Sequence, residues 1–260
     1  MSSSIFGARL REWRVRRHLS QLALACDAGI STRHLSFMES GRALPSREMI
    51  LRLAEQLEIP LRERNELLLG AGFAPLYAQH GLGDQALRMA TEAVDRILAA
   101  HEPFPGLAID RHWTMVRANS VVAPLLAGVA PHLLAPPVNV MRLSLAPDGL
   151  LPQIVNAAEW RQHLLTRLAR QARETADSVL HALLEELRGL SAPADVPPVD
   201  SVIVPLRLRT PAGELSFIST TLVFGHPMDV TLSELAVELF FPADETTGDV
   251  LRTLAAAQRA

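Results

Sequence analysis

A single glycine between two short helical stretches constrains the fold of this chain most. Gly29 separates residues 20–28 from residues 31–40. If Gln21 is the first position of a helix-turn-helix unit, Ala25 is the fifth and Gly29 the ninth. The fifth residue must be small because the next helix packs across it, and the ninth must tolerate a positive φ, which suits glycine. The apolar positions that both helices would share are Leu24, Ile30, Leu35 and Met38. The pattern favours a helix-turn-helix whose second helix can enter a DNA major groove over a plain helical hairpin.

The same part of the sequence predicts three further helices. Apolar residues recur at helical spacing between arginines over residues 6–17, which indicates an amphipathic basic helix built on Phe6, Leu10 and Trp13. A fourth helix follows residue 46, and residues 61–69 form a fifth that ends in Gly-Ala-Gly. Suitable N-caps precede the second, third and fourth helices, namely Ser20, Ser31 or Thr32, and Ser46. We therefore expect a small all-α domain.

The positive charge is unevenly distributed along the chain. All 25 basic residues are arginine, and residues 1–80 hold 11 of them against 8 acidic residues. The remaining residues hold 14 arginines against 20 acidic residues. A basic N-terminal part on an acidic body suggests that only the first part meets a polyanion. The alternative is an arginine-rich helix face that is simply solvated.

The sequence offers no recognisable catalytic or metal-binding motif. It has no Gly-x-Ser-x-Gly, no phosphate-cradling glycine loop and no His-Glu-x-x-His, and its nine histidines are scattered. The one cysteine, Cys26, cannot form an internal disulfide, and we expect it to be a small buried side chain. We therefore expect no enzyme, no catalytic residue and no metal site.

Composition and hydropathy favour a soluble cytoplasmic protein. Hydrophobic residues make up 48% and charged residues 20% of the chain, which is typical of a globular protein. The N-terminus lacks the apolar core of a signal peptide. The longest apolar stretch, residues 121–138, is interrupted by prolines and a histidine, which argues against a membrane span.

Beyond a turn-rich linker at residues 76–84, the periodicity changes. A helix from residue 85 is followed by a predicted hairpin at residues 106–119, and Asn119 is a suitable cap for the next helix. Helical periodicity then covers residues 159–190. Three further strands are predicted at residues 201–209, 213–224 and 233–242. Two strands, then helices, then three antiparallel strands is the order of a PAS-like sensor domain. The fold class expected is α+β, with an all-α domain at 1–75 and a PAS-like domain at 85–260, its sheet covered by helices.

The N-terminal motifs resemble the XRE family of bacterial regulators. The family's pattern is present here as Ser20-Gln21, Ala25, Gly29, Glu39-Ser40-Gly41-Arg42 and Pro45-Ser46. In that family the start of the third helix reads base edges, which implies base contacts by Ser31, Thr32, Arg33, Ser36 and Phe37. Arg33 is the best candidate for a guanine contact because its guanidinium can pair with O6 and N7 together. Phosphate contacts, which set affinity and register, are expected from Ser20, Gln21, Ser40 and Arg42.

The C-terminal part resembles the ligand-binding domain of MmyB-like regulators, which joins a PAS-like fold to an XRE-type domain. The resemblance rests on the hairpin LAIDRHWTMVRAN, on residues 138–143, and on Trp160 followed by a basic helix. It implies a cavity for a small apolar molecule, such as a fatty acid, and no required cofactor. The candidate lining residues are Phe104, Trp113, Met115, Met141, Trp160, Phe217 and Phe224, with Arg117 or Arg142 meeting a carboxylate. The alternative is that these apolar side chains are ordinary core.

Two functions from different classes remain. The first is a ligand-responsive transcription regulator, a homodimer that grips two half-sites of double-stranded operator DNA about one helical turn apart. A small apolar ligand would then change the spacing or orientation of the DNA-binding domains. The second is a DNA-binding regulator whose C-terminal domain has a fully packed interior and only dimerises or binds a protein partner. A third, weaker reading makes the C-terminal domain an enzyme.

Overall fold

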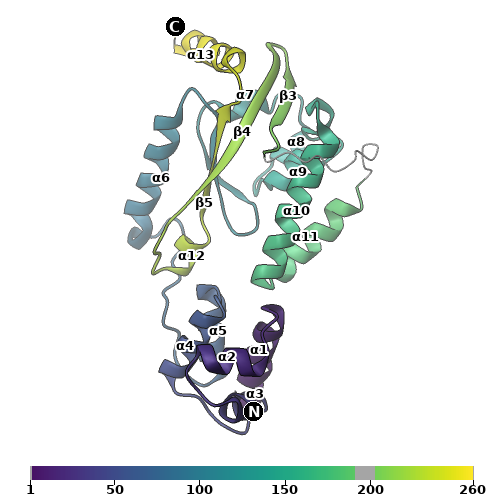
Figure 1. Ribbon diagram of the computed structural model, residues 1–260. Coiled ribbons are helices and arrows are strands. Elements are labelled where there is room, and N and C mark those ends of the chain that lie inside the picture. The colour runs from purple at the N-terminus through teal and green to yellow at the C-terminus, as the bar shows by residue number, and fades with distance from the viewer. Residues whose placement is uncertain (1, 191–202, 260) are drawn as a thin grey trace. The chain divides into compact units, whose positions relative to one another are not determined.

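The computed structural model describes residues 2–190 and 203–259, and contacts divide the chain into two compact units. Unit 1 comprises the chain up to His80 with Arg173–Ala176 and Pro227–Ser233, and unit 2 comprises the rest. Unit 1 is helical, whereas unit 2 combines a sheet with helices (Figure 1). The expected α+β class is confirmed.

Each of the five helices predicted for the N-terminal domain is present. They are α1 (Ser2–Arg16), α2 (Gln21–Asp27), α3 (Thr32–Glu39), α4 (Arg47–Gln56) and α5 (Leu61–Gly70). Serine hydroxyls cap three of them by accepting hydrogen bonds from backbone amides, because these amides lack partners in the first helical turn. The capping serines are Ser20 for α2, Ser31 for α3 and Ser46 for α4.

The turn between α2 and α3 has the geometry that the spacing predicts. Gly29 has φ +64°, a left-handed conformation that favours glycine. Ala25 is 1% exposed, because its small side chain lies under the crossing helix. The shared core contains the buried side chains Leu24, Leu35 and Met38, with Ile30 half-buried against them.

The short segment expected to be a linker is held by a second part of unit 1. Ala78 forms a β-bridge with Asp229, whose carboxylate also accepts the backbone N–H of His80 at 3.1 Å. The ring Nδ1 of His80 lies 2.8 Å from the same carboxylate oxygen. Residues 78–80 are thus tied to residues 229–231 by contacts that the local turn signals do not reveal.

Unit 2 is built on a five-stranded antiparallel sheet, as far as the chain is described. Its strands are β1 (Gly106–Ile109), β2 (Met115–Ala118), β3 (Leu206–Thr210), β4 (Gly213–Val223) and β5 (Ala236–Pro242). The order β2-β1-β5-β4-β3 places the two N-terminal strands beside the last one, and along the described chain two strands, then helices, then three antiparallel strands follow as predicted. The three C-terminal strands are shorter than predicted, since β3 begins at Leu206, β4 ends at Val223 and β5 begins at Ala236. Residues 201 and 202 lie outside the described residues, and α12 (Val230–Ser233) takes up the start of the last predicted strand.

Helices cover both faces of this sheet. The register places Leu107, Glu238 and Thr221 on one face, while Ala108, Val237 and Leu222 lie on the other. The first face packs against α10, and the second against α6 (Figure 1). The helical segments of unit 2 are η1 (Gln85–Leu87), α6 (Arg88–His101), α7 (Val122–Leu125), α8 (Pro131–Leu134), α9 (Val140–Leu145), η2 (Leu151–Gln153), α10 (Ala157–Thr175), α11 (Ser178–Arg188) and α13 (Glu245–Arg259).

Two expectations about individual residues were wrong. Asn119 does not cap α7, whose N-cap is Val121 without a side-chain hydrogen bond. Asn119 is buried instead, where its side chain accepts the Gly106 N–H and donates to the carbonyl of Phe104 at 2.8 Å. Cys26 is exposed rather than buried, because it lies on the outward side of α2.

Gly7 allows α1 to approach the end of α3 closely. A Cβ at this position would lie 2.5 Å from the carbonyl oxygens of Met38 and Glu39. We expect Gly7→Ala to lower the free energy of unfolding by about 1–3 kcal/mol, because the helices must shift apart. Alanine normally stabilises a helix relative to glycine, so a loss of stability in Gly7→Ala would indicate the close approach of the two helices.

The matched control is Gly70→Ala at the end of α5, where the added Cβ would meet its nearest atom at 3.6 Å. Urea denaturation of both variants gives the comparison. A Gly7→Ala variant as stable as the Gly70→Ala variant would contradict the close approach.

Candidate functional site

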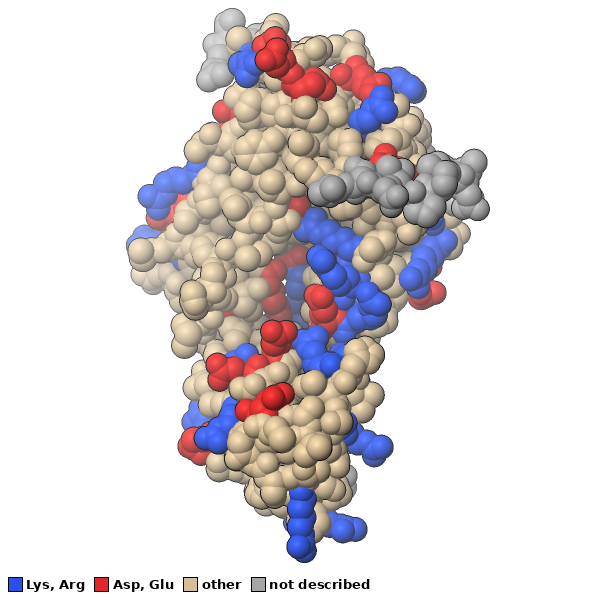
Figure 2. Space-filling model, in the orientation of Figure 1, with Lys and Arg blue, Asp and Glu red and all other residues tan. Residues whose placement is uncertain are grey.

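The outer side of α3 carries the residues predicted to read DNA. Ser31 and Arg33 are exposed, and Thr32, Ser36 and Phe37 are half-buried. The Ser31 hydroxyl already accepts the His34 N–H at 3.1 Å, so its role as helix cap is filled. Figure 2 shows arginine side chains projecting at the end of unit 1 where α3 lies.

An aromatic ring on α3 organises two arginines. The guanidinium of Arg33 lies over the Phe37 ring, 5.3 Å from its centroid, and that of Arg42 lies 6.0 Å from the same centroid. Such contacts hold a cation over the negative face of the ring. The structure therefore brings together one predicted base-contacting arginine and one predicted phosphate-contacting arginine.

The other predicted phosphate contacts have partners within unit 1. The Ser20 hydroxyl accepts the Ala23 N–H, and the Ser40 hydroxyl donates to the Phe37 carbonyl at 3.3 Å. The side-chain amide of Gln21 donates to Glu39 Oε2 at 2.8 Å. The hydrogen bonds of these side chains therefore stabilise the helix-turn-helix itself.

Arg14 is the partner that lets Glu39 be buried. It binds the Glu39 carboxylate twice, through Nε at 2.6 Å and Nη2 at 2.9 Å, and donates through Nη1 to the Leu19 carbonyl. The hydrogen bond to Glu39 raises the pKa of the Arg14 guanidinium above its ordinary value, although burial acts in the opposite sense. Arg14 lies among the arginines of the predicted basic helix, but a solvated arginine face does not describe it, because α3 supplies a buried carboxylate there.

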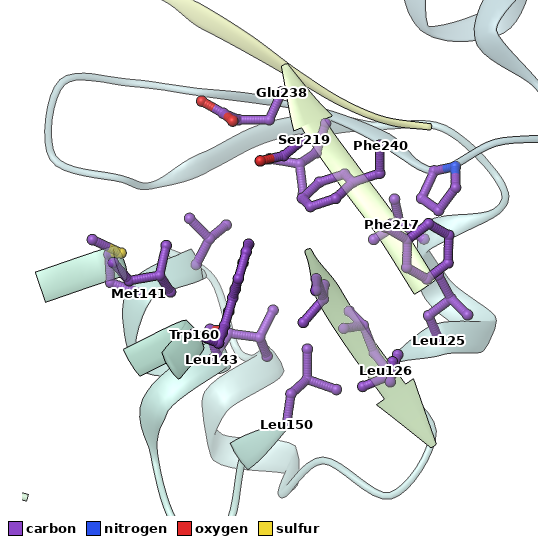
Figure 3. A pocket seen from close by; sticks show the side chains of 18 of the residues that line it. Leu125, Leu126, Met141, Leu143, Leu150, Trp160, Phe217, Ser219, Glu238 and Phe240 are labelled. Atoms are coloured by element: carbon purple, nitrogen blue, oxygen red, sulfur yellow. The ribbon is translucent and has the colours of Figure 1, made fainter. Parts of the chain in front are cut away.

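Unit 2 contains an apolar cavity of about 120 Å³ between the sheet and its covering helices (Figure 3). An engineered cavity of about 150 Å³ is enough to take up benzene. Side chains from strands and helices that lie far apart in the sequence converge on it. The apolar lining includes Leu125, Leu126, Met141, Leu143, Leu150, Trp160, Phe217 and Phe240.

Four of the predicted lining residues lie at this cavity, namely Trp113, Met141, Trp160 and Phe217. Phe104 and Met115 instead pack half-buried against the surrounding core. Phe224 follows the end of β4 and is also half-buried, away from the cavity lining.

The two arginines expected to meet a ligand carboxylate lie elsewhere. Arg117 is exposed on β2 opposite Ala108, on the sheet face that packs against α6, and its Nε lies 3.4 Å from the Asp95 carboxylate. Arg142 is exposed on α9 and forms two 2.7 Å hydrogen bonds with Glu186. Helical geometry explains why Arg142 faces away from the cavity, because its neighbours Met141 and Leu143 occupy the buried side of α9.

Two charged residues that the sequence analysis did not predict line the cavity. Glu238, from β5, is only 4% exposed, and Arg167, from α10, binds its carboxylate through both Nη atoms. The Thr221 hydroxyl donates to Glu238 Oε1 at 3.0 Å. A lone glutamate in the apolar strand AVELFFP is the signal that could have identified this site, since a buried carboxylate needs a cationic partner.

Trp113 fixes the position of Arg167. The guanidinium lies 4.7 Å from the centroid of the Trp113 ring, and the indole Nε1 donates to Gln171 Oε1 at 2.8 Å. Trp113 has φ +66°, which is unusual for a bulky residue. The turn between β1 and β2 holds this conformation through Asp110. The Asp110 side-chain carboxylate accepts the N–H of Thr114, and the Asp110 backbone carbonyl accepts the N–H of Trp113. Strained backbone of this kind is often retained at functional sites.

Within residues 2–190 and 203–259, no cluster of histidine, cysteine or acidic side chains is arranged to hold a metal ion. In the same ranges, no helix is long and apolar enough to cross a membrane.

The fold and site define a helix-turn-helix transcription regulator with a ligand-binding domain. A helix-turn-helix domain profile matches residues 5–67, and the profile described as "MmyB-like transcription regulator ligand binding domain" matches residues 90–254. The chain therefore belongs to the MmyB-like family of transcription regulators. The XRE-type resemblance of its N-terminal part is confirmed, and these families are regulators rather than enzymes.

Solved structures with similarity to this chain include two bacterial regulators. The restriction-modification controller protein C.AhdI from Aeromonas hydrophila is 39% identical, over 24% of this chain and 94% of its own, with a TM-score of 0.23. The clp gene regulator ClgR from Corynebacterium glutamicum is 25% identical, over 40% of this chain and 96% of its own, with a TM-score of 0.25. An RNA-binding Light-Oxygen-Voltage receptor is 14% identical, over 97% of this chain and 64% of its own, with a TM-score of 0.30. No curated protein sequence matches the chain significantly.

We expect His163 to make the stability of unit 2 sensitive to mild acid. Burial lowers the pKa of its imidazole below the ordinary value, and the charge of Arg167 lowers it further, against the opposing charge of Glu238. Between the lowered folded pKa and the unfolded pKa of about 6.5, the unfolded chain binds more protons. We therefore expect the free energy of unfolding to fall as the pH drops below about 6.5.

His163→Gln should reduce this loss between pH 7.5 and 5.5, as measured by urea denaturation. His226→Gln, at an exposed position, is the matched control for the histidine-to-glutamine change itself. An undiminished loss in the His163→Gln variant would show that other groups cause it.

Proposed function

We propose that this protein is a transcription regulator whose C-terminal domain senses a small, largely apolar molecule. The observation that carries the proposal is the apolar cavity in a domain of a ligand-binding family. Its lining of leucines and aromatic rings suits the hydrocarbon part of a fatty-acid-like molecule. No cofactor is required for this function.

The helix-turn-helix domain is proposed to read an operator in double-stranded DNA. Arg33 would contact a guanine, and the base contacts would be completed by Ser31, Thr32, Ser36 and Phe37. The phosphate contacts would come from Ser20, Gln21, Ser40 and Arg42. The exposure of Arg33 and Arg42, and their shared contact with Phe37, support this division.

Regulation would act through a homodimer on two half-sites. Half-sites about one helical turn apart require two copies of the reading helix at a fixed spacing. A ligand can alter that spacing only if it binds one arrangement of the dimer more tightly than another. The sign of regulation depends on which arrangement the ligand prefers.

Native mass spectrometry of the purified chain, compared with denaturing extraction, tests the sensor function. We expect a dimer mass and a co-purifying apolar molecule at about one per subunit. Adding back the extracted molecule to stripped protein should change operator affinity at least about tenfold, a coupling typical of regulatory sites. Ligand binding without any change in operator affinity would support a C-terminal domain that only dimerises or binds a protein.

Substitution of the two α3-associated arginines tests the DNA interface. Arg33→Ala should weaken specific operator binding by about 1–3 kcal/mol and relax the choice of base at one position. Arg42→Ala should weaken binding to all DNA sequences alike and reduce its salt dependence. Binding measured by fluorescence anisotropy on operator, single-base variants and unrelated DNA separates the two. An equal loss on every sequence for Arg33→Ala would show that Arg33 touches phosphate.

A further inference from the structure

The polar end of the apolar cavity carries a negative charge that is already neutralised. Glu238 lies on β5, between β1 and β4, and points to the cavity side of the sheet (Figure 3). Its side chain is 5% exposed, and Arg167 and Thr221 donate to its carboxylate. The pair of Glu238 and Arg167 has no net charge.

The charge of Arg167 is already balanced by one carboxylate. Among the described residues that line the cavity, it is the only one with a positive charge. Its Nη1 donates to Glu238 and its Nη2 donates to Glu238 and Thr221, while Trp113 covers the face of the guanidinium. A ligand carboxylate would have to displace Glu238 or share the guanidinium with it, and either leaves one buried negative charge without a cation of its own, which is strongly unfavourable.

Hydrogen-bond acceptors at this end remain open. Glu238 Oε2 accepts a hydrogen bond from Arg167 Nη1, and a carboxylate oxygen has room for another. The Ser219 side chain, next to Glu238 in Figure 3, also faces the cavity and can accept or donate. A neutral group with an O–H or N–H donor satisfies these acceptors without adding charge.

We propose that the cavity selects an uncharged apolar ligand with a terminal hydrogen-bond donor, such as a primary alcohol or primary amide, and rejects the corresponding carboxylate. The inference rests on the proposed sensor function and specifies its ligand class. It replaces the expectation that Arg117 or Arg142 meets a carboxylate, since those arginines pair with Asp95 and Glu186 away from the cavity.

The first test compares 1-hexanol, hexanamide and hexanoate, whose chains suit a cavity of about 120 Å³. Isothermal titration calorimetry with the full chain at neutral pH, where hexanoate is ionised, gives each Kd. The alcohol and the amide should bind at least about tenfold more tightly than the carboxylate, because only hexanoate places a like charge beside Glu238.

The outcomes separate this inference from the proposed function. Hexanoate binding as tightly as hexanol would overturn the ligand class and leave the apolar sensor standing. If none of the three compounds binds, the sensor function and the ligand class both fail.

The second test changes the charge while keeping the side-chain shape. Glu238→Gln leaves Arg167 with an uncompensated positive charge, so hexanoate should gain at least about tenfold in affinity over wild type. Glu186→Gln is the matched control, because Glu186 forms a similar bidentate pair with Arg142 on the surface. It should leave the preference for hexanol unchanged.

Circular dichroism on heating establishes whether the Glu238→Gln variant is folded. A folded variant that still rejects hexanoate would overturn the proposal. If the variant does not fold, the ranking of the three compounds on the wild-type chain decides.

Discussion

A carboxylate can be buried only beside a partner, and the C-terminal domain depends on this constraint at Glu238. The residue lies on the central strand β5, at a cavity whose lining side chains are mostly apolar. Arg167 must therefore reach it from α10, which fixes the position of that helix over the sheet. The Trp113 ring lies against the guanidinium, so the hairpin of β1 and β2 is held to the same point. One ion pair thus ties together three parts of the chain that surround the cavity.

The same constraint organises the helix-turn-helix domain. Glu39 ends α3, and its carboxylate is held by Arg14 of α1 and by Gln21 at the start of α2. Two residues of the family motif, Gln21 and Glu39, therefore help to fix the position of α3 against α1 and α2. Their occurrence in the motif has a structural explanation, whereas Arg33 and Arg42 are exposed and are the arginines proposed to contact DNA. A role in the fold does not prevent Gln21 from also meeting a phosphate with its second amide hydrogen.

The features that the sequence predicted are those set by neighbouring residues. Ser20 and Ser46 cap helices through amides three positions away, and Gly29 makes its turn through its own φ. The features that the sequence could not place depend on partners distant in the chain. Arg167 and Glu238 are 71 residues apart, and only the paired sheet and its covering helix bring them together. Asn119 was taken for a cap for the same reason, because its buried partners lie on segments before β1 and on α6.

The neutral ion pair also determines where the energy for regulation must come from. Because Glu238 and Arg167 satisfy each other, a ligand gains little from charge and must rely on burying its hydrocarbon chain. Each buried methylene contributes about 0.8 kcal/mol, so a six-carbon chain gains roughly 5 kcal/mol. Moving a two-state equilibrium from 1:99 to 99:1 needs about 5.5 kcal/mol of difference between the states. A ligand of this size can therefore drive most of such a shift only if it buries its chain in one state of the domain and almost none of it in the other. The cavity would have to be closed in that other state.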